Sequence, residues 1–326
     1  MYGEIKLFSG TSNPALAEEI SEYLGIPLSG CDIIEFPNEN IFVKLHKSVR
    51  GQDVFIIQPT CRSVNRRITL DGERASSVND NLMELLIMID TMKRASAGRI
   101  TAVVPYYAYG RSDKKDQPRV PITARLVADL ITVAGADRFM TIDLHAGQIQ
   151  GFFSIPGDEL TAFYILRDYF LEKEVPNAVV VAPDIGASKK GRNFAQALDV
   201  PLAIVEKRRA GTETEALTLI GDVQGKNAII FDDEVDTAAT LTEAVEILED
   251  EGARDIYACA THAVLSPPAV ERIRSVNLKE LVVTNTVSIP PEKMLPNITV
   301  LSVAPLLGEV IRRVHLGISV GEMFGE

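Results

Sequence analysis

Acids and hydroxyls are concentrated in one short segment, residues 232–240. Asp232 and Asp233 follow directly after Asn227–Phe231, an apolar segment typical of a buried β-strand. Asp236 and two threonines follow within the same segment. Carboxylates placed there accept hydrogen bonds from sugar hydroxyls, or bind Mg²⁺ through their oxygens or through water.

A helix is predicted after these acids. Thr240 and Glu243 match a capping box, and apolar residues recur at helical spacing from Leu241 to Leu248. A loop between a strand end and a helix start presents free backbone N–H groups and the positive end of the helix dipole, which favour a phosphate. Phosphate, hydroxyls and metal together indicate a sugar phosphate. The alternative, an acidic surface turn, is costly so close to a buried strand.

Two further acids follow predicted strands. Asp184 comes directly after Val179–Pro183, and Asp143 precedes His145 after Phe139–Ile142. Because ligands bind at the carboxyl ends of parallel strands, a histidine and an aspartate on neighbouring strand ends could share a divalent metal. A lone histidine after a strand is more often a structural group, and the residues alone leave both interpretations open.

Basic and aromatic residues mark three other segments. Residues 207–209 (Lys-Arg-Arg) follow a strand predicted to end at Val205, and indicate a mobile basic loop whose cations would stabilise charge on a transferred phosphoryl group. The alternative is a solvated surface run. The loop Tyr106–Asp116 suits a purine and its phosphates. Phe36–Asn40 is either a base-stacking edge or a turn before the strand Ile41–Leu45.

The composition indicates a globular chain with two domains. The chain has 326 residues, 46% of them hydrophobic, and its net charge of −12 disfavours a nucleic-acid groove. We expect neither a signal peptide nor a membrane span. The three cysteines make no CxxC pair, which argues against a zinc finger and fits a reducing cytoplasm.

Strand patterns alternate with helical patterns, which predicts an α/β fold with mostly parallel sheets flanked by helices. The plan occurs twice, so we expect domains at residues 1–155 and 156–306, with a tail, 307–326, that packs on the first domain. Helices are predicted at 14–24, 81–94, 123–134, 160–171, 186–198, 241–250 and 305–313, and strands near 5–8, 54–58, 100–105, 139–142, 179–183, 202–205, 228–231, 256–261, 281–284 and 299–302.

The segment 232–240 resembles the phosphoribosyl diphosphate signature shared by phosphoribosyltransferases and ribose-phosphate diphosphokinases. Together with residues 79–90, 143–153, 183–186 and 207–209, it makes nearly the whole chain similar to the ribose-phosphate diphosphokinase (phosphoribosyl diphosphate synthase) family. The resemblance implies two phosphoribosyltransferase-like domains and a transferase. The reaction would move the β,γ-diphosphoryl group of Mg-ATP to the anomeric hydroxyl of ribose 5-phosphate, giving phosphoribosyl diphosphate and AMP. A homo-oligomer, a hexamer or a smaller even assembly, is also implied.

The resemblance assigns roles to matching residues. Lys207 and Arg209 would be catalytic, and His145 and Asp184 would bind Mg²⁺. The ribose 5-phosphate site would comprise Asp232, Asp233, Asp236, Thr237, Ala238, Ala239 and Thr240; the ATP site would comprise Phe36, Asn38, Asn40, Arg111, Ser112 and Asp113; and an effector site for phosphate or ADP between subunits would comprise Ser48, Arg50, Asp158, Ser319 and Phe324.

Three positions depart from the family's pattern. Asn40 stands where the family has an acid, and Ser112 where it has an amide. Both changes touch the nucleotide, so we expect nucleotide affinity or choice to differ more than the sugar substrate. Ala239 stands at a glycine position of the signature, which could tighten the phosphate loop.

Two other functions compete with the enzyme. A regulatory paralogue that joins catalytic subunits would usually lose the basic segment or the metal ligands, whereas this chain keeps Lys207, Arg209, His145 and Asp184. An ordinary phosphoribosyltransferase acting on a base needs only one such domain, and would not explain the repeated plan.

The polar segment 62–78 is longer than the link expected in the family, and is predicted to be a surface loop or a short hairpin with Asp71-Gly72 as its turn. It lies near the predicted effector residues, so we hypothesise that it alters allostery or assembly; a passive insertion is the alternative. Deletion of 63–76 should then change the phosphate response of the activity or the oligomer size. Assays and analytical ultracentrifugation that find both unchanged would exclude the hypothesis.

Overall fold

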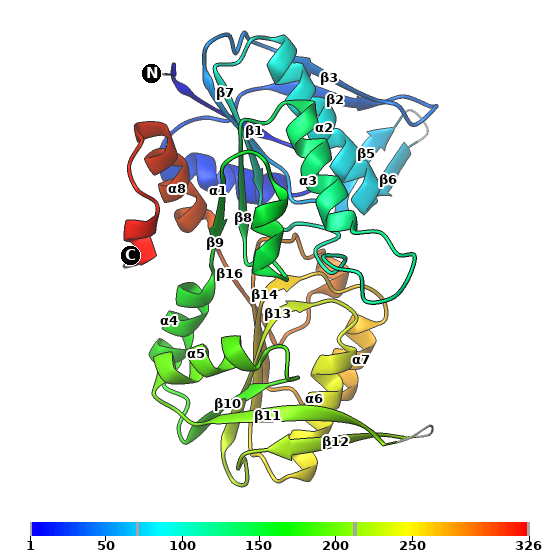
Figure 1. The fold of residues 1–326 in the computed structure, drawn as a ribbon, viewed down its shortest axis with the longest axis vertical. Coiled ribbons are helices and arrows are strands. Elements are labelled where there is room, and N and C mark those ends of the chain that lie inside the picture. Colours follow the sequence, from blue (N-terminus) through cyan, green and yellow to red (C-terminus); the bar gives the residue numbers. More distant parts are fainter. Residues whose placement is uncertain (1, 70–71, 211–213, 325–326) are drawn as a thin grey trace. The chain divides into compact units, whose positions relative to one another are not determined.

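The computed structural model describes residues 2–69, 72–210 and 214–324. By its internal contacts the chain divides into two compact units. Unit 1 comprises Met1–Leu160, Thr286–Ser288 and Ser302–Glu326, and unit 2 comprises Thr161–Asn285 and Ile289–Leu301. Both units are built from strands and helices around mostly parallel sheets, so the predicted α/β fold class is confirmed (Figure 1).

A parallel sheet forms the centre of unit 1, in the order β1 (Ile5–Ser9), β4 (Asp53–Ile57), β7 (Arg99–Val104), β8 (Arg138–Ile142) and β9 (Gly157–Leu160). Its inner strands are almost wholly buried, as parallel strands covered on both faces are. Buried side chains of α2 (Val78–Arg94) and α3 (Thr123–Ala134) share one apolar cluster with the sheet.

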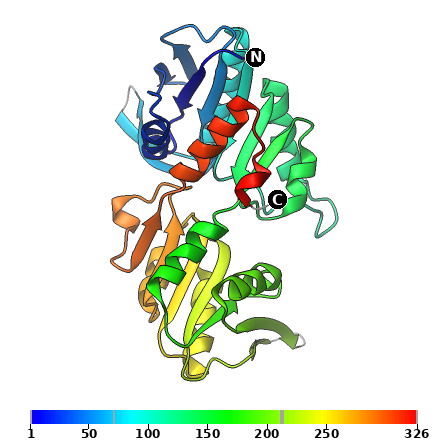
Figure 2. The ribbon, with the colours of Figure 1, turned by 90° about the vertical axis from the view of Figure 1, so that its left-hand side faces the viewer.

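Two helices from opposite ends of the chain lie side by side in unit 1. Figures 1 and 2 show α8 (Ala304–Leu316) beside α1 (Pro14–Leu24). Gly308 makes the close approach possible, because a Cβ there would lie 2.4 Å from a ring carbon of Tyr23. A short 3₁₀ turn, Gly321–Phe324, follows α8.

A second, smaller sheet of unit 1 has the order β3 (Ile41–Leu45), β2 (Cys31–Glu35), β5 (Ser63–Thr69) and β6 (Gly72–Ser76). The antiparallel pairing of β5 with β6 confirms a hairpin in the polar segment 62–78. Gly72 belongs to β6, and the predicted turn residue Asp71 lies outside the described residues. The strand β2 was not predicted.

The sheet of unit 2 has the order β12 (Thr214–Ile220), β11 (Leu202–Ala210), β10 (Ala178–Ala182), β13 (Asn227–Val235), β14 (Ile256–Ala263), β15 (Glu280–Thr284) and β16 (Ile298–Leu301). All its pairings are parallel except that of β11 with β12. The helices are α4 (Phe163–Lys173), α5 (Ser188–Leu198), α6 (Ala239–Asp250) and α7 (Ala269–Ser275), with 3₁₀ turns at Gly147–Phe152 in unit 1 and Pro291–Lys293 in unit 2.

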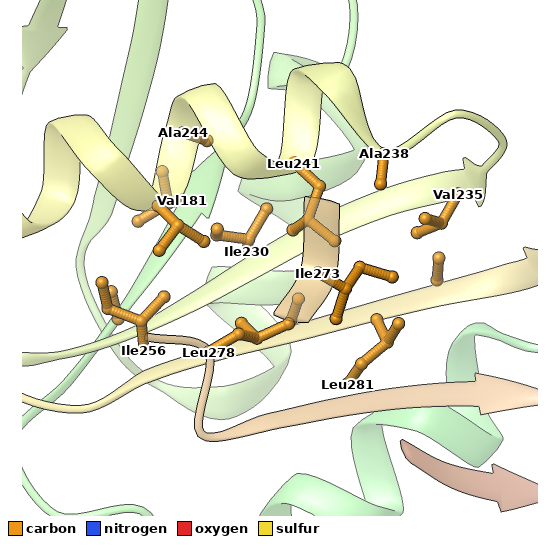
Figure 3. Close-up of a cluster of buried hydrophobic side chains, with 14 of the residues drawn as sticks. Val181, Ile230, Val235, Ala238, Leu241, Ala244, Ile256, Ile273, Leu278 and Leu281 are labelled. Atoms are coloured by element: carbon orange, nitrogen blue, oxygen red, sulfur yellow. The ribbon is translucent and has the colours of Figure 1, made fainter. Parts of the chain in front are cut away.

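Two apolar clusters cover opposite faces of this sheet, because successive strand residues point to opposite sides. On one face, Phe194 of α5 stacks on Phe231 of β13 with ring centroids 4.3 Å apart. On the other, Ile230 lies among residues of α6 and α7 (Figure 3). Full burial of each large apolar side chain stabilises the fold by roughly 1.5–3 kcal/mol.

The structure corrects several predicted boundaries. The helix predicted over Thr123–Ala134 is confirmed residue for residue. The strands predicted to end at Val205 and Phe231 continue to Ala210 and Val235. The helix α7 was not predicted, because it is short and follows two prolines.

A buried carboxylate fastens α8 to the sheet of unit 1. Asp53 of β4 is fully buried and accepts two hydrogen bonds from Arg99, at 2.8 and 2.5 Å. Nδ1 of His315 lies 2.8 Å from the same carboxylate. Arg99 also donates to the carbonyl of Val314 at 3.0 Å, so one arginine joins strand, acid and helix.

Replacement of this acid should destabilise unit 1 strongly. Asp53→Asn removes the charge that pairs with Arg99 in the interior, and loss of one partner of a buried pair costs about 3 kcal/mol. Asp90→Asn is the control, because Asp90 pairs with Arg94 at 2.6 Å on an exposed helix face, where ion pairs contribute little. Urea unfolding measures both. Equal losses in the two variants would contradict the role of Asp53.

Candidate active site

The candidate site lies at the carboxyl edge of the sheet in unit 2. The strands β10 and β13 are parallel neighbours, with Val181 opposite Ile230. Asp184 comes two residues after the end of β10, and Asp232 and Asp233 lie in the last part of β13. The parallel register therefore places the three predicted acids at the same level of the sheet.

The close approach of these acids disfavours their charged forms. Asp232 as a residue is half-buried, yet its carboxyl is so far removed from water that burial raises its pKa well above its usual value. The neighbouring Asp233 raises it further, and Asp184 adds a smaller effect in the same direction. Such a group is stabilised by hydroxyl donors or by a cation.

Sequence reasoning missed a cation beside these acids. Nζ of Lys190, in the first turn of α5, lies 3.7 Å from the carboxylate of Asp233. The side chain of Asp233 is 13% exposed and that of Lys190 is 45% exposed. The only signal in the sequence is the position of Lys190 six residues after Asp184, on a helix that starts from the same sheet edge.

The carboxylate of Asp184 is held by the start of α5. Its Oδ1 accepts a hydrogen bond from the backbone N–H of Ala187 at 2.8 Å. A Cβ at Gly186 would lie 3.0 Å from the same oxygen, so glycine leaves room for the carboxylate. The acid thus sits at the positive end of a helix dipole, which stabilises its charge.

The phosphate loop, residues 235–239, runs from the end of β13 to the start of α6. Ala238 has a left-handed backbone with φ 60° and ψ 13°, and the helix begins at Ala239. The predicted capping box of Thr240 and Glu243 is wrong: Ala238 is the N-cap, and no side chain of the described residues caps the helix. The first N–H groups of α6 can therefore donate hydrogen bonds to another partner.

The same geometry corrects the interpretation of Ala239. The family's glycine position falls on the first helical residue, where an alanine fits without strain. The left-handed conformation that favours glycine falls on Ala238 instead. The departure at Ala239 therefore does not tighten the loop through its backbone conformation.

Two contacts hold the phosphate loop from outside. Nη1 of Arg272 donates to the carbonyl of Thr237 at 3.0 Å. The N–H of Leu265 donates to the carbonyl of Val235 at 3.0 Å, and Nζ of Lys293 donates to the carbonyl of Leu265 at 2.7 Å. None of these three residues was predicted from the sequence.

The basic segment is a strand and not a loop. Lys207 and Arg209 belong to β11, where they pair with Leu217 and Glu215 of β12. Since Ala182 pairs with Ile204, β11 extends past the end of β10 on the side of the sheet where Asp184 lies. The predicted loop was wrong because the antiparallel partner β12 was not foreseen.

The predicted nucleotide residues of unit 1 lie in two loops. Phe36–Asn40 is the turn between β2 and β3, and the N–H of Phe36 donates to the carbonyl of Asn40 at 2.9 Å. The turn before Ile41–Leu45 is therefore confirmed, and Phe36 is 43% exposed. Exposure leaves its ring available for stacking, which stays a prediction.

In the second loop, Ser112 has a structural partner. Its hydroxyl accepts from the backbone N–H of Thr123 at 3.2 Å, at the start of α3. Asp113 is buried and accepts from Nε2 of Gln148, while Arg111 is exposed. The serine thus orders this loop through its hydroxyl. It has no side-chain amide for the predicted nucleotide contact.

His145 lies in the exposed loop after β8, in unit 1. Glu159 of β9 holds this loop through the N–H of Leu144 at 3.0 Å and through Gln150. Asp184 belongs to unit 2, so their pairing around one metal stays a prediction. In the described part of the chain, no group of three or more histidines, cysteines or acids is arranged as a metal site.

The predicted effector residues have local partners in unit 1. Oγ of Ser48 accepts from the N–H of Arg50 at 3.3 Å. Asp158 of β9 makes a two-pronged pair with Arg138, at 2.6 and 2.7 Å. The carbonyl of Ser319 accepts from Arg313 at 2.8 Å, and Phe324 lies in the last 3₁₀ turn. Binding of an effector by these residues stays a prediction.

Comparison with known proteins adds two family models. Residues 5–135 match the N-terminal domain of ribose phosphate pyrophosphokinase. Residues 207–325 match the phosphoribosyl synthetase-associated domain. Together the two models cover most of the chain, including the phosphate loop and the last four residues of β11.

Similar chains cover nearly the full length. A ribose-phosphate pyrophosphokinase of Caldanaerobacter subterraneus is 52% identical over 98% of both chains, and one of Synechococcus elongatus is 50% identical over 98% of this chain and 93% of its own. The crystal structure of phosphoribosylpyrophosphate synthetase from Mycobacterium smegmatis is 41% identical, with a TM-score of 0.87 over 97% of this chain and 100% of that one.

In the described residues, none of the helices has the length and apolar content that crossing a bilayer requires.

The backbone of the phosphate loop predicts opposite effects on stability for glycine substitutions at two neighbouring positions. Ala238→Gly should leave stability unchanged or raise it by up to about 1 kcal/mol, because relief of the left-handed strain offsets the entropy gained by the unfolded chain. Ala239→Gly should destabilise by about 0.5–1 kcal/mol, because Ala239 is helical. Urea unfolding of both variants measures the difference. Equal destabilisation would contradict the conformation of the loop.

Proposed function

We propose how the residues of this chain, which belongs to the ribose-phosphate pyrophosphokinase family, carry out the family's reaction. The enzyme transfers the β,γ-diphosphoryl group of ATP to the anomeric hydroxyl of ribose 5-phosphate. The hydroxyl oxygen attacks the β-phosphorus, the bond from that phosphorus to the oxygen bridging the α-phosphorus breaks, and AMP leaves. The product, phosphoribosyl diphosphate, serves nucleotide biosynthesis.

The observation that supports ribose 5-phosphate binding in unit 2 is the join of β13 to α6. Asp232 and Asp233 provide partly desolvated carboxylates that accept hydrogen bonds from ribose hydroxyls. The phosphate loop follows within a few residues and ends at an uncapped helix start. Residues Asp236 to Thr240 hold the 5-phosphate there through backbone N–H groups and threonine hydroxyls.

A divalent cation is proposed near the acids at the sheet edge. The carboxyl groups of Asp184, Asp232 and Asp233 make this edge acidic beside the ammonium of Lys190, and oxygen donors are the ligands that Mg²⁺ prefers. Asp184 and His145 are the proposed ligands. When bound, Mg²⁺ would neutralise charge on the diphosphoryl group. Independently of it, Lys190 offsets part of the repulsion between Asp233 and the phosphates.

Lys207 and Arg209 are the proposed catalytic cations. They stand two positions apart in β11, beyond the level at which β10 ends. Cations there stabilise the charge that develops on the transferred group, which is the main requirement of phosphoryl transfer. Their presence favours the enzyme over a regulatory paralogue, which would usually lack them.

The proposed ATP site comprises the exposed ring of Phe36 together with Asn38, Asn40, Arg111, Ser112 and Asp113. An aromatic face stacks on adenine, and an arginine pairs with phosphates.

The three cysteines are free, which fits a reducing compartment such as the cytoplasm. A homo-oligomer and regulation by phosphate or ADP are proposed from the family alone.

Phosphorus NMR tests the activity directly. The purified chain with Mg²⁺-ATP and ribose 5-phosphate should form AMP and phosphoribosyl diphosphate in equal amounts. No turnover with ATP or with other nucleoside triphosphates, in the presence of phosphate, would instead support a regulatory subunit.

Lys207→Ala should lower kcat by two orders of magnitude or more, while ribose 5-phosphate still binds, because the lysine acts mainly in the transition state. Lys226→Ala is the control: it removes the same charge at the other end of the sheet, directly before β13, where Lys226 pairs with Asp222 at 2.9 Å. Steady-state kinetics and calorimetric binding of ribose 5-phosphate measure both. Near-normal turnover of Lys207→Ala would remove its proposed role.

A further inference from the structure

Arg272 of α7 contacts the backbone of the predicted phosphate segment Asp236–Thr240 from outside α6. Its guanidinium donates to the carbonyl of Thr237 at 3.0 Å. Thr237 precedes the N-cap Ala238, so its carbonyl lies outside the hydrogen-bond ladder of α6. The arginine therefore supplies a partner that the helix does not.

The direction of this carbonyl matters for an anion site. A loop binds phosphate by turning consecutive N–H groups toward it, and a carbonyl oxygen turned the same way would repel the phosphate. The left-handed backbone of Ala238 makes the required change of direction. A hydrogen bond on the carbonyl of Thr237 opposes its rotation toward the phosphate, and the guanidinium adds positive potential behind the loop.

The helix that carries Arg272 is itself fixed against the loop. Ile273, the next residue, is buried in the apolar cluster that contains Val235, Ala238 and Leu241 (Figure 3). These residues come from both ends of the phosphate loop. Packing at Ile273 sets the distance between α7 and the loop, and so sets the length of the contact that Arg272 makes.

We propose that Arg272 is a positioning residue for ribose 5-phosphate: it holds the carbonyl of Thr237 away from the phosphate, so that the N–H groups at the start of α6 face it. The proposal rests on ribose 5-phosphate binding at the phosphate loop. Arg272 does not touch the reacting atoms. Its loss weakens binding of the sugar phosphate equally in the ground state and the transition state.

Three variants test this role. Arg272→Met removes the donor and keeps the length of the side chain, and Arg272→Lys keeps a donor. Arg274→Met removes the same charge from an exposed position on the same helix. Arg272→Met should raise KM for ribose 5-phosphate about tenfold, the effect of a hydrogen bond or two, with kcat and KM for ATP within about twofold of the parent. Arg272→Lys should recover at least part of the loss, and Arg274→Met should match the parent.

A second measurement separates this role from general stability and from the activity. In hydrogen exchange without substrates, amides of residues 236–242 should exchange faster in Arg272→Met than in Arg274→Met, with Tm within a few degrees. An unchanged KM for ribose 5-phosphate, or a rise in both KM values with a large fall in Tm, would overturn the proposal. If the parent shows no turnover, the proposed function fails, and unaltered exchange in Arg272→Met would then overturn the positioning role as well.

Discussion

The parallel pairing of β10 with β13 is the constraint on which the candidate site depends. It brings Asp184 to the level of Asp232 and Asp233, although some fifty residues separate them in the chain. Parallel neighbours need a crossover, and apolar clusters on both faces of the sheet hold the register. The position of the acids therefore depends on the packing of the interior of unit 2.

The sheet edge carries an electrostatic cost in the absence of ligands. Burial disfavours the charged form of Asp232, and Asp233 adds repulsion. Lys190, the helix start behind Asp184 and the helix start after Ala238 each supply positive charge or partial charge. In the proposed function, ribose hydroxyls and a divalent cation would meet the carboxylates, and the phosphate would meet the N–H groups.

The wrong predictions have particular causes. Thr240 and Glu243 have the residue types of a capping box, but the chain turns earlier, at Ala238, because Leu241 packs against the sheet and sets where the helix begins. The residues Lys207 to Arg209 are polar, so the sequence predicts a loop there. Backbone pairing with β12 makes them a strand, and such pairing depends on a segment that the local sequence does not reveal.

The sequence by itself determined the α/β class and most helices and inner strands, because the periodicity of apolar residues follows directly from residue type. It also predicts the segment 232–240 as the centre of the chemistry. Only the tertiary structure decided that Ala238 carries the left-handed turn, that Lys190 lies beside Asp233, and that Arg272 holds the carbonyl of Thr237. These are contacts between elements brought together by packing, and no local pattern of residues specifies them.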